Sequence, residues 1–169
     1  MTIPEASAGP LPLAAGTFRI DREGAWHHDD QEVTHPGVLR SLYANLRAED
    51  RTHYLQVGPA RIPVVVDDAP FVVTRVEPTC VPEDSQHIIR IHLSDGTAEW
   101  LGAEAFWLGP RETPYCRVKS GRFVARLSVA AWLQLARFVE EGAGPGQAVL
   151  VLGDRRVPLS RRGGGCGPG

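Results

Sequence analysis

The acidic pair Asp67-Asp68 is the stretch of this sequence with the clearest potential for chemistry. It interrupts the hydrophobic run Val64–Val73, which reads Val-Val-Val-Asp-Asp-Ala-Pro-Phe-Val-Val. Adjacent carboxylates can repel each other enough to raise the pKa of one of them, which suits general acid catalysis. An acidic turn that accepts hydrogen bonds from backbone amides before the proline explains the same residues, and we favour that interpretation. We expect a pocket at this turn and Phe71, opposite Arg61 or Arg75.

A second group of potential ligands follows Trp26. Imidazole and carboxylate side chains suit borderline metals. The group comprises His27, His28, Asp29, Asp30 and His35. Neighbouring residues of a strand point to opposite faces, so we interpret the group as a solvated insertion loop and predict no metal site. The residues that we expect to bind a ligand are Asp67, Asp68, Phe71, Trp26 and His28.

No other motif predicts catalysis or a cofactor. Cys80, Cys116 and Cys166 lie far apart without paired metal spacing, which is typical of reduced thiols in a cytoplasmic protein. Arg117 could favour a Cys116 thiolate, but an ordinary buried thiol is the favoured interpretation. The glycine-rich stretch Gly142–Gly146 follows a predicted helix, whereas phosphate loops precede one. We therefore predict no catalytic residue and no cofactor.

Composition narrows the class of protein. The 169 residues are 43% hydrophobic and 22% charged, as in ordinary globular proteins, with a formal net charge of −2. That charge disfavours nucleic acid and anionic membrane surfaces as partners. No apolar run approaches the roughly 20 residues that span a bilayer. Residues 1–16 lack the basic start of a secretion signal, so we expect a flexible leader and a cytoplasmic location.

Two helices are expected to position these residues. Hydrophobic residues recur at helical spacing over Val38–Leu46, with Arg40 and Arg47 among the residues on the other side. Thr34 precedes His35-Pro36, which predicts an N-cap at Thr34. Ser128 is expected to cap a second helix that runs to about Glu141.

The rest of the chain is predicted to be mainly strands. Ala60–Val66 and Phe71–Val76 are expected to be core strands joined by a tight turn at 67–70, and Glu77–Gln86 a polar connection. The other main strands are predicted at Thr17–Ile20, from Ala25, and at Tyr54–Val57, His87–Leu93, Tyr115–Lys119, Phe123–Leu127, Gln147–Leu152 and Arg156–Leu159.

Three blocks of sequence recur in the same order, which indicates an internal duplication. The first block has the same spacing in Phe18, Gly24 and Trp26 as in Tyr115, Gly121 and Phe123. The second matches Thr34 and Val38-Leu39 with Ser128 and Trp132-Leu133. The third matches Leu55–Val64 with Leu150–Leu159. We predict an α+β fold of two strand–strand–helix–strand–strand repeats with mostly antiparallel sheets. The expected divisions are a leader (1–16), a first repeat (17–77), connecting strands (78–114), a second repeat (115–160) and a disordered tail (161–169).

These features also resemble a known family. The residues that carry the likeness are Ile20, Gly24-Ala25-Trp26, His28, Val38–Leu46, Tyr54–Val57, above all Val66–Phe71, and Val118, Gly121 and Ala125–Ser128. With them the chain, from about Phe18 to Leu159, resembles the bacterial domain-of-unknown-function family 1285. The polar stretch 27–31 departs from that family's pattern. The resemblance implies an α+β fold of repeated motifs with a signalling or ligand-sensing role, and it supplies no catalytic residues.

Three functional hypotheses follow. The first is a non-enzymatic signalling or ligand-sensing module that binds a small molecule or a protein partner between its repeats. The alternative is a metal-assisted or carboxylate-based hydrolytic enzyme that uses 27–30 with Asp67 or Asp68. The third is a scaffold that forms a homodimer through unpaired strand edges.

Overall fold

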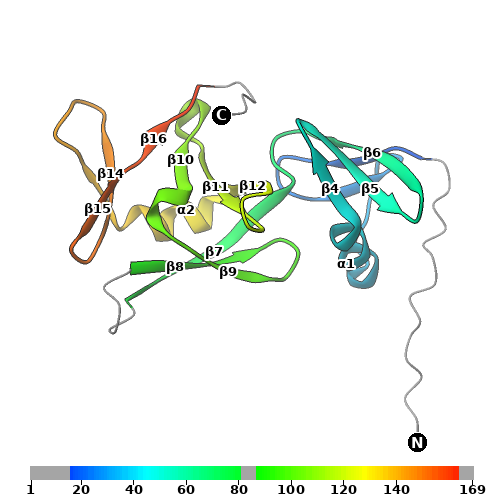
Figure 1. Cartoon of the computed structure of the whole chain (residues 1–169), viewed down its shortest axis with the longest axis horizontal. Helices are drawn as coiled ribbons and strands as arrows, with labels where there is room; N and C mark the ends of the chain where they lie inside the picture. Colours follow the sequence, from blue (N-terminus) through cyan, green and yellow to red (C-terminus); the bar gives the residue numbers. More distant parts are fainter. Residues whose placement is uncertain (1–15, 81–86, 164–169) are drawn as a thin grey trace, which may run out of the picture.

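The computed structural model describes residues 16–80 and 87–163 of the chain (Figure 1). Almost all of the predicted leader and most of the predicted tail lie outside these residues. The described part contains two α-helices and sixteen strands in three sheets, so the predicted α+β class is confirmed. None of its helices has the length and apolar character needed to cross a membrane.

The first sheet has six strands in the order β3-β2-β1-β6-β5-β4. β1 and β6 are parallel, and the other neighbours are antiparallel. The strands are β1 (Phe18–Ile20), β2 (Trp26–His28), β3 (Gln31–Glu32), β4 (Leu46–Glu49), β5 (Thr52–Val57) and β6 (Ala60–Val66). The helix α1 (Pro36–Asn45) joins β3 to β4 and contacts β5. We refer to this sheet and α1 as the first half.

The cap of α1 differs from the prediction. His35, not Thr34, is the N-cap, and its Nδ1 accepts hydrogen bonds from the backbone N–H groups of Gly37 and Val38. Pro36 takes the first helical position, where a missing N–H costs no helical hydrogen bond. An imidazole nitrogen can thus satisfy the free amides of a helix start as a hydroxyl would.

The second sheet has seven strands in the order β16-β10-β11-β12-β7-β8-β9. Two neighbouring pairs, β12 with β7 and β10 with β16, are parallel. The strands are β7 (Phe71–Cys80), β8 (His87–Leu93), β9 (Ala98–Leu101), β10 (Phe106–Leu108), β11 (Pro114–Val118), β12 (Phe123–Leu127) and β16 (Ser160–Arg161), with short 3-10 turns at Ala103–Ala105 and Pro110–Glu112. β7 pairs with β8 as far as Cys80, so the predicted connection from Glu77 begins inside a strand.

The helix α2 (Val129–Ala136) packs on β7 and β12 and precedes a third sheet. Ser128 Oγ accepts a hydrogen bond from the N–H of Ala131, which confirms the predicted cap. The predicted end near Glu141 is wrong, because Val139–Glu141 forms β13 and pairs with β14 (Ala148–Leu152). β15 (Arg155–Pro158) completes the order β13-β14-β15. We refer to the second and third sheets and α2 as the second half.

The expected turn at 67–70 is a crossover between two sheets. β6 pairs with β1 and β5 in the first sheet, whereas β7 pairs with β12 and β8 in the second. The prediction of two core strands paired across this turn is therefore wrong. Hydrophobic runs on either side of a proline-containing turn fit a hairpin and a crossover equally well, and only long-range pairing distinguishes them.

Part of each half shows the same order of elements, but the sheet pairing differs. Each contains a hairpin, a helix and a three-stranded antiparallel meander: β1–β2, α1 and β4–β6, then β11–β12, α2 and β13–β15. β6 returns to pair with β1, whereas β15 pairs within the described residues only with β14. The predicted closing hairpins match β5–β6 and β14–β15, but the strands β4 and β13, which precede them, are missing from the prediction.

One hydrophobic core joins the halves. Among its buried side chains are Trp26, Leu42, Phe71, Phe123, Leu135 and Leu150. The β1–β2 turn approaches β7 so closely that a Cβ on Gly24 would lie 2.6 Å from Val72 Cγ2. Gly24 also has φ +87°, a conformation that side chains disfavour. The junction between the halves is therefore tightly packed near this glycine.

Candidate site in the groove between the halves

A groove of about 290 Å³ lies where α1 meets the turns of the second sheet. Its walls come from α1 and the start of β4 on one side and from the β8–β9 and β11–β12 turns on the other. The lining residues are Arg40, Tyr43, Ala44, Leu46, Arg47, Phe71, Asp95, Thr97, Lys119, Arg122 and Phe123. Both halves therefore contribute to it.

Aromatic rings form the base of the groove. The Phe71 ring is stacked on Tyr43 with 5.2 Å between ring centroids, and Phe123 meets Phe71 edge-on, also at 5.2 Å. Trp26 lies behind them, with its ring edge-on to Tyr43 at 5.5 Å. Such arrangements add to the stability gained from burial. The rings give the groove a rigid apolar base that belongs to both halves.

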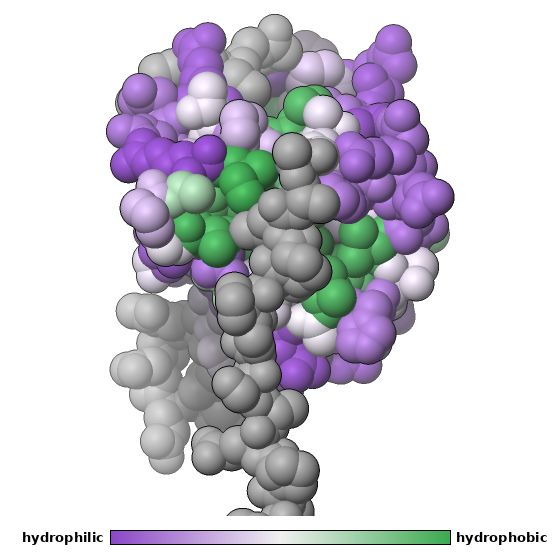
Figure 2. All heavy atoms as spheres, turned by 90° about the vertical axis from the view of Figure 1, so that its right-hand side faces the viewer, coloured by the Kyte–Doolittle hydropathy of each residue, from purple (hydrophilic) through white to green (hydrophobic). Residues whose placement is uncertain are grey.

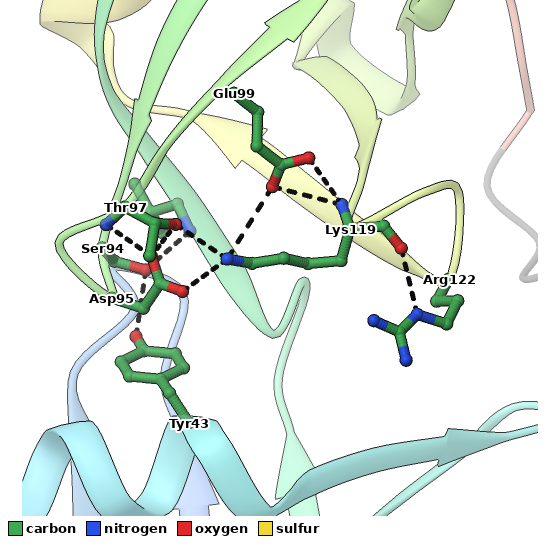
Figure 3. A network of polar contacts seen from close by, with 8 residues as sticks. Tyr43, Ser94, Asp95, Thr97, Glu99, Lys119 and Arg122 are labelled. Carbon is green, nitrogen blue, oxygen red and sulfur yellow. Dashed lines mark hydrogen bonds and ion pairs between the residues drawn. The ribbon is translucent and has the colours of Figure 1, made fainter.

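A polar network closes one end of the groove (Figure 3). The hydroxyl of Tyr43 donates to Ser94 Oγ at 2.9 Å, and the same oxygen accepts the N–H of Val72 at 3.1 Å. Lys119 Nζ donates to Asp95 Oδ2 and to Thr97 Oγ1, both at 2.7 Å. The network ties α1 to the β8–β9 turn and that turn to the β11–β12 turn.

Ionic contacts hold Asp95 charged. Burial acts to raise the pKa of the Asp95 carboxyl, but hydrogen bonds from Lys119 and Thr97 outweigh it and leave the pKa below its usual value of 3.8. Lys119 Nζ also lies 5.4 Å from the centroid of the Phe71 ring, within cation–π range. Lys119 is therefore a structural cation whose charge is balanced inside the network.

The β11–β12 turn has an unusual backbone. Lys119 and Ser120 have φ of 53° and 57°, in the left-handed region that non-glycine residues seldom adopt. The carboxylate of Glu99 accepts the N–H of Lys119 at 2.9 Å, and the Lys119 carbonyl accepts Arg122 Nε–H at 3.1 Å. These bonds hold the turn in place and direct Arg122 into the groove lining.

Three arginines of the groove have no carboxylate partner within the described residues. They are Arg40 on α1, Arg47 at the start of β4 and Arg122 in the β11–β12 turn. Arg47 Nη1 donates to the carbonyls of Ala44 and Leu46, both at 2.9 Å. Asp95 and Glu99 both pair with Lys119, so the positive charge of the groove comes from the three arginines, in a chain whose formal net charge is −2.

The acidic pair predicted as a site is divided between two arginines. Arg19 donates to both oxygens of Asp67 through Nε and Nη2, at 2.6 to 3.1 Å. Asp68 accepts Tyr115 OH at 2.8 Å and Arg126 Nη1 at 3.0 Å. The hydrogen bond from Arg19 is the main reason that the pKa of Asp67 is below its usual range, which is the opposite of what general acid catalysis needs.

The expected arginine partners of this turn are wrong. Arg61 pairs with Glu49 at 2.7 Å, and Arg75 pairs with Glu77 at 2.5 Å. Glu77 lies two residues beyond Arg75 on the same strand, β7, whereas Glu49 lies in β4 and Arg61 in β6. Neither Asp67 nor Asp68 lines the groove.

Phe71 is the predicted ligand-binding residue that the groove contains. Trp26 is fully buried behind Tyr43, and its Nε1 has no hydrogen-bond partner among residues 16–80 and 87–163. His28 stacks on Phe18 with ring centroids 4.6 Å apart, and its buried Nε2 also has no hydrogen bond to the described part of the chain. The structure thus places Phe71 and Trp26 against the same residue, Tyr43, and leaves His28 elsewhere in the first half.

The histidine-rich stretch forms no common ligand set. His27 Nε2 lies 2.8 Å from Asp21 Oδ2, His28 Nε2 lies 3.7 Å from Asp29 Oδ2, and His35 caps α1. Across the described ranges, no three His, Cys, Asp or Glu side chains gather closely enough to hold a metal ion. Burial raises the pKa of the Cys116 thiol, which disfavours the thiolate considered from the sequence.

The first half also has hydrophobic residues at its surface (Figure 2). Seen from that half, hydrophobic patches lie among mostly hydrophilic residues (Figure 2). In this half, Val65 of β6 is the large hydrophobic residue that is substantially exposed, at 57%. It does not line the groove.

Two solved structures are similar to this chain. A DUF1285 family protein from Silicibacter pomeroyi DSS-3 is 22% identical with a TM-score of 0.69, and the match covers 90% of this chain and 88% of that chain. A DUF1285 family protein from Shewanella baltica OS155 is 16% identical with a TM-score of 0.60, over 73% and 92% of the two chains. No protein-family model and no curated protein matches the sequence. The chain therefore has the fold of these DUF1285 family proteins, as the resemblance implied.

Proposed function

We propose that this protein is a non-enzymatic ligand-sensing module that binds a small molecule in the groove between its halves. The groove itself carries this proposal: its base and walls come from both halves, so an occupant contacts both at once. A ligand that binds one arrangement of two halves more tightly than another shifts the protein toward that arrangement. This is the physical basis of sensing without catalysis.

The polar network supplies a route by which occupancy affects the second half. Tyr43 lines the groove and bonds Ser94, and Ser94 bonds the backbone of Val72 in β7. Lys119 lines the groove and holds the β8–β9 turn through Asp95. A ligand that displaces Tyr43 changes the contact of α1 with the β8–β9 turn, and one that displaces Lys119 changes the contact between the β8–β9 and β11–β12 turns. A signalling partner that binds these turns would then distinguish the occupied from the empty groove.

The carboxylate-based hydrolase finds less support. Asp67 and Asp68 each bind a different arginine, and the pKa of Asp67 is lowered. Two carboxylates that share a proton would need to lie side by side, with the pKa of one of them raised. Dimerisation through strand edges stays a prediction, which light scattering over a range of protein concentration would check.

We also propose the duplication, the repeat boundaries at 17–77 and 115–160, and a cytoplasmic location. The common order of hairpin, helix and meander supports the duplication. The different pairing of β6 and β15 is then a later divergence. The buried, unpaired thiol of Cys116 is compatible with a reducing compartment.

A thermal-shift screen against metabolites tests the binding proposal, because a ligand of the native state raises the melting temperature. Ala44 is exposed and lines the groove, so Ala44→Trp fills it. Ala130→Trp is the control, since Ala130 is exposed on α2 away from the groove. We expect ligands that stabilise the native chain and Ala130→Trp but not Ala44→Trp. A screen without hits, or shifts that persist in Ala44→Trp, would overturn the proposal.

A further inference from the structure

We infer that the ligand of the groove is an organic phosphate, whose phosphoryl group is bound by Arg40, Arg47 and Arg122. This inference rests on the proposed function and adds the chemical class of the ligand. Its motive is that three exposed arginines from separate parts of the chain line one groove.

The charge of the groove is not neutralised by the protein. The arginines that pair with carboxylates are Arg19, Arg61, Arg75, Arg90, Arg126, Arg155, Arg156 and Arg161. Within the described residues, the three groove arginines have no such partner. Six other arginines in this part of the chain also have none, so the distinguishing feature of the three is their shared place in one groove. Those six are Arg22, Arg51, Arg111, Arg117, Arg137 and Arg162. Lys119 adds a fourth cation, but two carboxylates lie beside its Nζ, Asp95 at 2.7 Å and Glu99 at 3.8 Å. A multiply charged anion would neutralise what remains.

The three guanidinium groups also retain donors. An arginine offers five N–H donors, arranged so that two can meet two oxygens of one phosphate. Arg40 donates no hydrogen bond within the described residues. Arg47 uses Nη1 for the carbonyls of Ala44 and Leu46, and Arg122 uses Nε for that of Lys119. At least one pair of neighbouring N–H groups therefore stays available on each side chain.

The position of the arginines connects binding to sensing. Arg40 and Arg47 belong to the first half, whereas Arg122 lies on the β11–β12 turn of the second. Like charges on opposite walls repel each other when the groove is empty. A phosphoryl group bound between the walls attracts the arginines of both, so binding of the ligand favours a closer approach of the two walls.

Phenyl phosphate, with pyrophosphate as a second probe and benzyl alcohol as an uncharged analogue, tests this inference by calorimetric titration of the full chain. We expect phenyl phosphate and pyrophosphate to bind with an affinity that falls as salt rises, and benzyl alcohol to bind far more weakly. Arg40→Gln with Arg122→Gln should weaken phosphate binding about tenfold or more, because two charge-assisted contacts are lost. Folding of each variant is checked by its melting temperature without ligand.

The matched control is Arg51→Gln with Arg137→Gln, which removes the same charge from exposed arginines outside the groove. An equal loss of affinity in this control would overturn the inference, since nonspecific attraction would then explain binding. A second outcome separates this inference from the proposed function. If no phosphate binds, but uncharged metabolites raise the melting temperature of the native chain and not of Ala44→Trp, the inference is overturned and the proposed function stands. Absence of any ligand in both experiments would overturn both.

Discussion

Tyr43 and Ser94, 51 residues apart in the sequence, join α1 to the second sheet through a 2.9 Å hydrogen bond. Burial raises the pKa of the Tyr43 hydroxyl, so it stays protonated and able to donate. Tyr43→Phe keeps the ring contacts with Trp26 and Phe71 but removes this donor. We expect the free energy of unfolding to fall by about 0.5–1.5 kcal/mol, measured by urea denaturation.

Tyr54→Phe is the matched control for that loss. Tyr54 is half-buried in β5, and its hydroxyl has no hydrogen bond within the described residues. It should unfold at the same urea concentration as the native chain. If the two variants lose equal stability, the Tyr43–Ser94 bond contributes nothing specific.

Lys119 balances the charge of Asp95 in the same junction. Lys119→Met keeps most of the side-chain volume but leaves Asp95, whose side chain is 9% exposed, without its ionic partner. Because Lys119 itself is partly exposed, solvent screens the pair, and we expect a loss of about 1–3 kcal/mol in urea unfolding. Arg51→Met, on an exposed arginine outside the network, serves as the control and should unfold like the native chain.

The same variant changes the acid sensitivity of the fold. The folded pKa of Asp95 lies below its ordinary value of 3.8, so this group stabilises the native state above pH 3.8. That contribution is lost as pH falls through the lowered folded pKa. Lys119→Met should lose less stability over this acidic range than the native chain does. Parallel pH profiles would contradict the role given to Lys119.

Local patterns in the sequence located most strands but not their partners. The predicted ranges Ala60–Val66, His87–Leu93 and Phe123–Leu127 coincide with β6, β8 and β12, because turn residues bound β-branched and apolar runs there. The crossover at 67–70 has the local chemistry of a hairpin turn, so local patterns predict a hairpin there, and this prediction is wrong. Val139–Glu141 was assigned to a helix although pairing with β14 holds it as a strand.

The sequence predicts binding between the repeats, but the arginines that line the groove could not be predicted, for a related reason. Arg40 and Arg47 lie opposite the hydrophobic side of the α1 pattern, where solvent is the default expectation. Arg122 follows a glycine turn that resembles any hairpin connection. They line one groove because the crossover at 67–70 leads from β6 in the first sheet to β7 in the second, where β12 pairs with β7. Phe71, in the segment that carries the family resemblance, was the one signal that pointed to the groove.

His53 makes stability depend on pH near neutrality. Its ring stacks beside Phe123, with 6.4 Å between centroids, and burial lowers its pKa from the usual 6.5. Above pH 6.5 the residue is neutral in both states. As pH falls below 6.5 the unfolded chain takes up a proton first, so the native state loses stability until its own lowered pKa is passed.

His53→Gln should remove this component of the pH dependence. Urea unfolding of the native chain and of His53→Gln, measured from above pH 6.5 to more acidic pH, gives the difference in their free energies of unfolding. As pH falls, this difference should change in favour of the variant. Other histidines contribute equally to both chains and cancel in the difference. A difference that stays constant with pH would contradict a lowered pKa at His53.

Asp68 connects the crossover to β11 and β12 through Tyr115 and Arg126. Burial first, and the hydrogen bond to the Asp68 carboxylate second, raise the pKa of Tyr115 to about 12. Asp68→Asn removes the charge but not the burial, so the pKa of Tyr115 should fall part of the way toward its usual value of 10.0. Ultraviolet absorbance titration of tyrosinate, compared with Tyr115→Phe to identify the signal, measures this change.

Asp67→Asn is the control that separates the two neighbours. It removes a carboxylate one residue away that binds Arg19, and it leaves the contact of Asp68 with Tyr115 in place. The titration of Tyr115 should then match that of the native chain. Equal shifts from the two substitutions would mean that the carboxylates act as one charged patch, and the division of the pair between two arginines would lose its functional meaning.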